Sequence, residues 1–363
     1  MMMWLMCRRL LVPMLILCLA GCESLTSQDY SLETPAQILS VLAAPAIRDG
    51  RARFRQIFQD LIANDPNFET YSEATQEFLL RLSDEPPVPE GAARKPSGGI
   101  RLRVLIVAGL FDECISDVVN VFETARTDPS FQPHRIEEIS VSGRSSCDYN
   151  AGLIAEAVEG LTLHGGERLL LLGHSKGAAD ILHFLVNYPE TAKRVSAVVS
   201  VAGAINGSLL AEKAAGWYDK LAGWSVTDRC DAGDGEALEN LKRSFRLNWL
   251  AAHPLPQSIP CFSAVAFTDR QRVNSMLKPG YDLLKPIDPR NDGLLLFHDQ
   301  VIPGATLLGY ANADHWSVVY PIEEKHPRLA SALLQQEPFP RNAFLRAILL
   351  YVAEYLQNGE VDQ

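Results

Sequence analysis

Residues 169–177 read LLLLGHSKG, an apolar run that leads directly into a G-x-S-x-G turn. The run before the turn predicts a buried strand, and residues 178–188 continue with apolar side chains at helical spacing. A sharp turn between such a strand and helix would hold Ser175 exposed. Gly173 and Gly177 flank the serine, because larger side chains there would crowd the turn and the packed strand and helix.

This turn resembles the nucleophile elbow of the α/β-hydrolases, and the resemblance implies Ser175 as the nucleophile. It also implies an α/β-hydrolase fold, a mostly parallel and doubly wound sheet, over about residues 100–357. A serine hydroxyl is a poor nucleophile at its own pKa, so a base must lie beside it. The chain after Ser175 should therefore supply a histidine and an acid.

The segments NDGLL at 291–295 and ADHW at 313–316 look like the acid and histidine loops of bacterial lipases and esterases. In this family the acid and the histidine follow the serine in that order. The resemblance thus implies Asp292 and His315 as the partners of Ser175. The histidine would take the serine proton, and the aspartate would fix its tautomer and stabilise the imidazolium.

Other acids and histidines stay open as alternatives. Asp269, at the end of an apolar strand, is the first reserve for the acid, followed by Asp288 and Asp299. His298 lies in a short Phe-His-Asp run typical of a strand edge, and His326 precedes a proline in a charged segment. Order and position before the last helix favour His315 over both.

Two backbone N–H groups should form the oxyanion hole. One belongs to Lys176, the residue after the nucleophile, and Leu110 in the loop after an early strand is our first choice for the other. Phe111 is the second choice, and Ala108 stands where the family usually has histidine. We expect the ammonium group of Lys176 to face solvent rather than to bind an anionic substrate.

The N-terminus has the layout of a secretory signal. Arg8 and Arg9 precede an apolar run at 10–19 that is too short for a membrane span of roughly 20 residues. The run ends in LAGC at 19–22, which resembles the lipobox of bacterial lipoproteins. That resemblance implies removal of residues 1–21, acylation of Cys22 and anchoring in the bacterial cell envelope; a buried helix is the alternative. Glu23, in place of aspartate, implies passage to the outer membrane.

Without the signal, 31 basic and 44 acidic residues remain, a formal charge of about −13. This acidity gives no electrostatic reason to bind nucleic acid or anionic lipid surfaces. Asp228, Asp231 and Asp234 lack the length and ligand order of a calcium loop, and no cysteine spacing resembles a zinc site. We predict neither a metal nor another cofactor, and the sequence does not indicate an oligomeric state.

The chain has seven cysteines, of which two lie in the signal and Cys22 would be acylated. An even number remains for an oxidising compartment, which favours disulfides. We prefer the pairs Cys114–Cys147, since each follows an early strand on the same edge, and Cys230–Cys261. Free buried thiols are the alternative.

Composition divides the chain into five parts: the signal, a polar tether at 22–33, an N-terminal helical extension at 34–85, a Pro/Gly-rich linker at 86–99 and a hydrolase domain at 100–363. A helical cap is expected as an insertion at about 204–257. Strands are predicted near 101–108, 136–141, 168–172, 195–202 and 260–267, and helices near 115–126, 150–163, 176–188 and 343–357.

These features predict a lipid-anchored serine hydrolase that cleaves carboxylic esters, with an acyl ester or lipid-like molecule as substrate. Thioesterases and acyltransferases use the same triad, so both remain alternatives. A non-catalytic envelope lipoprotein on a hydrolase scaffold is a third.

Overall fold

A computed structural model describes residues 46–63, 78–87, 100–110, 120–213, 233–322 and 339–361. The predicted signal, Cys22, the tether and most of the linker lie outside these residues, as do Phe111, Cys114, Cys230 and His326. None of the described helices combines the length and apolar character that a membrane crossing requires.

The core is one eight-stranded sheet with the order β1-β8-β7-β6-β5-β3-β4, and β2 adds to β8 off this path. All neighbouring strands are parallel except β2, which runs antiparallel to β8. The five predicted strands are present, and the α/β-hydrolase architecture is confirmed. The strands are β1 (Arg48–Asp49), β2 (Leu79–Leu80), β3 (Arg101–Val107), β4 (Arg135–Ile139), β5 (Glu167–His174), β6 (Val195–Val201), β7 (Cys261–Phe267) and β8 (Thr306–Asn312).

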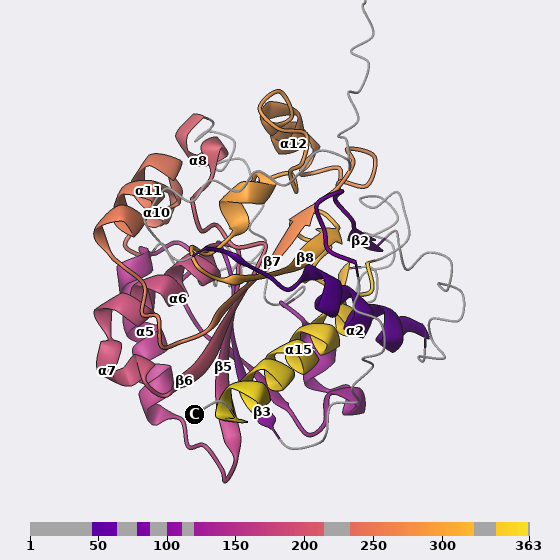
Figure 1. Cartoon of the computed structure of the whole chain (residues 1–363). Coiled ribbons are helices and arrows are strands. Elements are labelled where there is room, and N and C mark those ends of the chain that lie inside the picture. Colours follow the sequence, from indigo (N-terminus) through magenta and orange to yellow (C-terminus); the bar gives the residue numbers. More distant parts are fainter. Residues whose placement is uncertain are drawn as a thin grey trace, which may run out of the picture. The chain divides into compact units, whose positions relative to one another are not determined.

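Helices cover both faces of the sheet, as Figure 1 shows. Because side chains alternate along a strand, β3 and β5 each feed two apolar clusters. One cluster includes α2 (Arg51–Ala63) and α15 (Arg341–Val361), and the other includes α5 (Cys147–Gly160) and α6 (Lys176–Asn187). The first receives Val104, Ile106, Leu170 and Leu172, and the second receives Leu105, Val107, Leu169 and Leu171.

The segment expected as a helical extension holds a helix and also contributes to the sheet. Its described part holds α2 and two short strands, and both strands pair with β8. The Phe54 ring lies 5.6 Å from that of Phe344 on α15. Arg55 forms a buried ion pair with Glu85 and donates to the backbone oxygen of Leu79 at 2.7 Å. The segment is therefore built into the hydrolase core.

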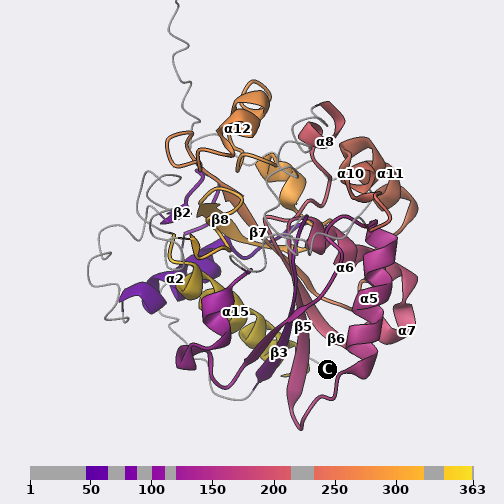
Figure 2. The ribbon, with the colours of Figure 1, turned by 180° about the vertical axis from the view of Figure 1, so that it is seen from behind.

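The predicted cap contains three described helices: α8 (Leu209–Lys213), α10 (Ala237–Leu241) and α11 (Arg243–Ala252). Together with α12 (Lys278–Leu284) they gather at one end of the sheet in both views (Figures 1 and 2). Residues 214–232 lie outside the described part. The side-chain oxygens of Asn240 and Asp234 accept hydrogen bonds from the backbone N–H groups of Cys147 and Ser146, both at 2.8 Å, so this insertion holds the start of α5.

The disulfide prediction is wrong for both pairs, because each contains a thiol that the structure shows to be free. Cys147 opens α5 and Cys261 opens β7, and both are buried and unpaired. Burial raises the pKa of the Cys261 thiol to about 12. A domain of this size buries enough apolar surface to be stable without cross-links, so these cysteines serve as small core residues.

Candidate active site

Ser175 lies at the junction of β5 and α6 with φ 53° and ψ −126°. A Cβ at Gly173 would lie 2.4 Å from the Cα of Ala178, and one at Gly177 would lie 2.1 Å from the backbone oxygen of Val107. Real Cβ atoms do not approach backbone this closely, so both positions require glycine. The turn has the strained geometry that the G-x-S-x-G pattern predicts.

The structure brings Ser175, His315 and Asp292 together. The Nε2 atom of His315 lies 2.8 Å from the Oγ of Ser175, and its Nδ1 lies 2.7 Å from the Oδ2 of Asp292. The backbone N–H of His315 also donates to the backbone oxygen of Asp292 at 2.9 Å. These distances are within hydrogen-bond reach, and the order of contacts is hydroxyl, imidazole, carboxylate.

The Asp292 carboxylate is fully buried and accepts hydrogen bonds on both oxygens. Its Oδ1 accepts from the backbone N–H groups of Leu294 at 2.8 Å and Leu295 at 2.7 Å. Its Oδ2 also accepts from the side-chain amide of Gln300 at 3.3 Å. The same amide exchanges two hydrogen bonds with the backbone of Ala266 on β7. Sequence reasoning missed Gln300, because nothing local to it signals this contact.

Two further residues hold the histidine loop. His174 contacts the backbone oxygen of His315 at 3.0 Å through its Nε2 atom, and the two rings lie 4.8 Å apart. Burial and the neighbouring His315 lower the pKa of His174, so its ring is neutral. Asp314 accepts from the backbone N–H groups of Asn274 at 2.6 Å and Ser317 at 2.8 Å. Asp314, the first residue of the D-H pair, therefore has a structural role in holding the loop that carries His315.

The loop after β3 passes directly against the serine. A Cβ at Gly109 would lie 2.7 Å from the Cβ of Ser175 and 3.3 Å from its Oγ. Leu110 follows, half-buried against an apolar cluster that also contacts Trp316. Lys176 begins α6, where the first backbone N–H groups have no partner within the helix. This places both residues predicted for the oxyanion hole beside Ser175.

The solved structure of the metagenomic carboxyl esterase MGS0156 is similar to this chain. The two are 39% identical with a TM-score of 0.76, and the match covers 89% of this chain and 97% of that one. The chain belongs to this carboxyl esterase family. It is therefore an ester-bond hydrolase on an α/β-hydrolase fold.

More distant solved structures include lipases. The mature lipase BlEst2 of Bacillus licheniformis is 18% identical, with a TM-score of 0.48 over 62% of this chain and 89% of that one. Lipase 1 of Pelosinus fermentans is 13% identical, with a TM-score of 0.47 over 65% and 99%. No protein-family model and no curated protein matches this chain.

The acids that the sequence left open as alternatives to Asp292 do not take its place beside His315 in this esterase. Asp288 pairs with Arg290 at 2.8 Å, and Asp299 pairs with Arg243 at 3.0 Å. Asp269 lies half-buried on the loop after β7. His298 lies 3.9 Å from Asp299 rather than at the serine. The Nδ1 atom of His315 contacts Asp292, as the order of motifs predicted.

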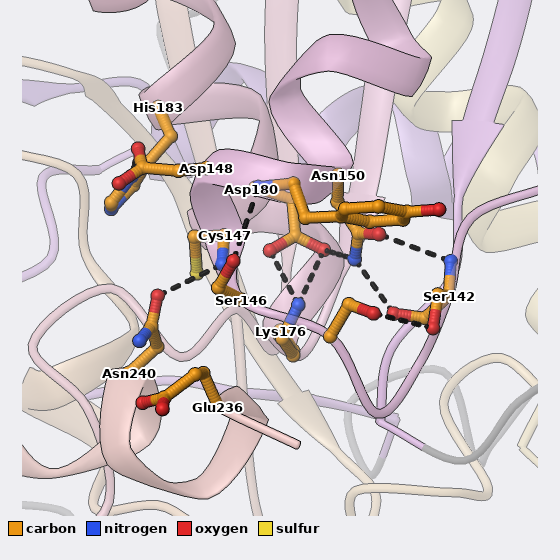
Figure 3. Close-up of polar contacts among 12 residues, drawn as sticks. Ser142, Ser146, Cys147, Asp148, Asn150, Lys176, Asp180, His183, Glu236 and Asn240 are labelled. Atoms are coloured by element: carbon orange, nitrogen blue, oxygen red, sulfur yellow. Dashed lines mark hydrogen bonds and ion pairs between the residues drawn. The ribbon is translucent and has the colours of Figure 1, made fainter. Parts of the chain in front are cut away.

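The expected exposure of the Lys176 side chain is wrong. Its side chain is 0% exposed, and its Nζ lies 2.7 and 2.9 Å from the two carboxylate oxygens of Asp180 (Figure 3). The sequence reasoning treated a lysine beside the serine as a surface residue, but the first turn of α6 directs this side chain into the protein. An acid four residues later on the same helix was the available signal.

The surroundings of the site are mainly apolar. The cluster near Leu110 also includes three successive leucines, 294–296, that directly follow the Asp292 turn. No grouping of three or more His, Cys, Asp or Glu side chains suited to a metal occurs within the described ranges. The contacts among Ser175, His315 and Asp292 offer proton transfer and nucleophilic attack beside this apolar cluster.

Proposed function

We propose that this esterase cleaves carboxylic esters through an acyl-enzyme on Ser175, with His315 as general base and Asp292 as its partner. One observation carries the proposal: an unbroken pair of hydrogen bonds, 2.8 and 2.7 Å long, links the Ser175 hydroxyl to the buried Asp292 carboxylate through His315. The strained turn at Ser175 and the relationship to a carboxyl esterase support it.

The reaction follows from these contacts. The Ser175 oxygen attacks the ester carbonyl carbon while His315 Nε2 takes the hydroxyl proton. The backbone N–H groups of Lys176 and Leu110 would stabilise the oxyanion that forms. The tetrahedral intermediate collapses, the C–O bond to the alcohol breaks, and His315 returns its proton to the leaving oxygen. Water then attacks the acyl-enzyme with the same proton transfers and releases the acid.

Asp292 fixes the tautomer of His315. Its Oδ2 accepts a hydrogen bond from the Nδ1–H group, which leaves the Nε2 lone pair facing the serine. No cation pairs with this carboxylate among the described residues; hydrogen-bond donors surround it instead. Its charge therefore remains available to stabilise the imidazolium. An Asp292→Asn variant should lose kcat by about 10⁴-fold.

The apolar cluster beside Leu110 and Trp316 supports an acyl ester with a hydrocarbon chain as substrate. The half-buried Leu110 follows Gly109 on the loop after β3, the half-buried Trp316 follows His315, and both contact the same apolar cluster. Burial of methylene groups contributes about 0.8 kcal/mol each, so chain length should affect kcat/KM. A series of p-nitrophenyl esters from acetate to palmitate measures this dependence.

The nucleophile is tested with a fluorophosphonate and intact-mass measurement. Wild type should gain one adduct and hydrolyse the esters, whereas Ser175→Ala should do neither. Ser130→Ala is the matched control, because Ser130 is exposed and belongs to another part of the fold. Adducts on Ser175→Ala, or none on folded wild type with or without detergent micelles, would refute the assignment. Ester exchange exceeding hydrolysis with an added alcohol would indicate an acyltransferase, and faster cleavage of matched thioesters a thioesterase.

We also propose that Cys22 carries the lipid that anchors the esterase in the bacterial envelope. The LAGC motif after a short apolar run supports this, and more than one acyl chain gives stable anchoring. In a Gram-negative host, radiolabelled palmitate should enter wild type but not Cys22→Ser. Membrane fractionation should place wild type in the outer membrane and Glu23→Asp in the inner membrane. Unlabelled wild type would refute the anchor.

A further inference from the structure

A buried ion pair begins at the residue after the nucleophile. Lys176 follows Ser175 in the chain, and its side chain is 0% exposed; Asp180, one helical turn later, is 1% exposed. Burial acts to lower the pKa of Lys176, but the Asp180 carboxylate raises it above the ordinary value, so the ammonium stays charged. The pair links the first turn of α6 to its second.

The pair is itself tied to the neighbouring helix. The side-chain amide of Asn150 on α5 donates to Asp180 Oδ2 at 2.8 Å. The same amide exchanges two hydrogen bonds with the backbone of Ser142, at 2.9 and 3.0 Å. Figure 3 shows the resulting chain from Lys176 through Asp180 and Asn150 to the loop before α5. Position 176 is thus held from inside the protein by the buried side chains of Asp180 and Asn150.

Stability gives little reason for such a pair. Removing two charges from water costs several kcal/mol per ion, and apolar side chains of similar volume are often as stabilising. What the pair does specify is geometry, because the ammonium contacts both carboxylate oxygens and the carboxylate has a further fixed partner. The backbone N–H of Lys176 lies in the segment fixed in this way.

We propose that Lys176 and Asp180 are positioning residues, whose ion pair fixes the first turn of α6 so that the Lys176 backbone N–H meets the oxyanion of the transition state. This inference rests on the proposed function of Ser175. Every substitution at position 176 other than proline keeps the N–H itself, so the effect of the side chain can be measured separately.

The test replaces the pair by apolar side chains in Lys176→Met/Asp180→Leu. We expect a folded protein with a kcat that is lower by about 10- to 100-fold, since loss of an oxyanion donor costs about 10²–10³ and displacement costs less. KM should change less than twofold. A trifluoromethyl ketone, which places an oxyanion in the site, should bind the double variant more weakly than wild type by the same factor. The matching alkyl ether forms no oxyanion and should bind both proteins equally.

A control replaces a less buried ion pair elsewhere by apolar side chains. Arg53→Met/Glu354→Leu removes a 2.6 Å ion pair between α2 and α15, and kcat should stay within twofold of wild type. If the double variant at the elbow does not fold, Asp180→Asn, which keeps polar atoms in place, should lower kcat by about fivefold with KM unchanged. All kcat values are given per Ser175 titrated by fluorophosphonate.

A kcat within twofold of wild type in the folded elbow variant, or equal weakening of ketone and ether, would overturn the positioning role. Failure of the proposed function would look different, because wild type itself would then carry no titratable Ser175.

Discussion

Ser175 occupies a backbone conformation that costs about 1–3 kcal/mol for a residue with a side chain. The surrounding structure holds it there. The backbone N–H of Ser175 donates to the backbone oxygen of Val201 at 3.4 Å, and the backbone oxygen of Ser175 accepts from the backbone N–H of Ala204 at 2.9 Å. The flanking glycines allow the helix and the neighbouring strand to approach closely. The addition of a single carbon atom at either flanking glycine should therefore disturb the turn at Ser175.

Gly177→Ala should abolish activity and lower the free energy of unfolding by several kcal/mol, because the new Cβ meets the backbone oxygens of Val107 and Ala108 at 2.1 and 2.4 Å. Gly160→Ala is the control, since nothing lies within 4 Å of its Cβ, and alanine there should be neutral or stabilising by up to about 1 kcal/mol. Urea unfolding and ester hydrolysis measure both. Equal stability of the two variants would contradict this account of the turn.

Asp299 should make stability depend on pH. Burial raises the pKa of Asp299 to about 6 from 3.8, although Arg243 pairs with it. The native state then binds the proton more tightly than the unfolded state, so the free energy of unfolding falls as pH rises from about 4 to 6. The fall is about 3 kcal/mol. Asp299→Asn cannot titrate, so its stability relative to wild type should rise by this amount.

Urea unfolding of both proteins at intervals from pH 4 to 7 measures that difference. A difference that stays constant across this range would show that Asp299 titrates alike in the folded and unfolded chains.

At the scale of elements, the N-terminal segment completes the sheet. An open strand edge exposes unpaired N–H and C=O groups and invites aggregation. β1 covers the start of β8 and β2 covers its end, while α2 fills the space against α15. The two short strands carry too few residues to be recognised by periodicity, and their partner lies more than 200 residues away in the chain.

A chain that begins at residue 88 lacks α2, β1 and β2, and we expect it to aggregate because the edge of β8 and the apolar partners of Phe54 and Phe58 become exposed. A chain that begins at residue 46 keeps every described contact of the segment and should remain soluble. Sedimentation and esterase activity compare them. Recovery of the shorter chain as an active monomer would show that the segment is dispensable.

At the scale of the molecule, the site depends on where parallel strands end. Ser175 follows β5 and His315 follows β8, while Asp292 comes from the connection between β7 and β8. Because these strands run in one direction, their carboxyl ends share one edge of the sheet, and residues 140 positions apart can meet there. The same shared core joins the N-terminal segment to the site.

Native-state hydrogen exchange should therefore report one cooperative unit. Phe54 and Phe58 of α2 belong to the same apolar cluster as residues of β3, β5 and α15. Amides within α2 and β5 should open with similar free energies, close to that of global unfolding. Mass spectrometry of peptides covering 51–63 and 167–174 measures both. Much faster exchange of α2 would indicate that the segment opens separately.

Local patterns in the sequence carried the prediction of the sheet and of the residues that meet at Ser175. The elbow could be read because its glycines, serine and apolar strand are consecutive, and Asp292 and His315 because their order is fixed by the resemblance. β8 was not predicted, since its short run contains Gly309 and ends at Asn312. The contacts of Gln300, Asp314 and Asn150 could not be predicted, because no local pattern fixes which side chain or backbone group each of them meets.

By itself the sequence determined the strands from β3 to β7, the turn at Ser175 and the chemistry available to the site, because these follow from neighbouring residues and their periodicity. Only the tertiary structure decided that Lys176 is buried against Asp180, that Cys147 and Cys261 stay free, and that the N-terminal segment closes the sheet. Burial and pairing depend on which surfaces meet, and that is a property of the packed chain rather than of any local stretch.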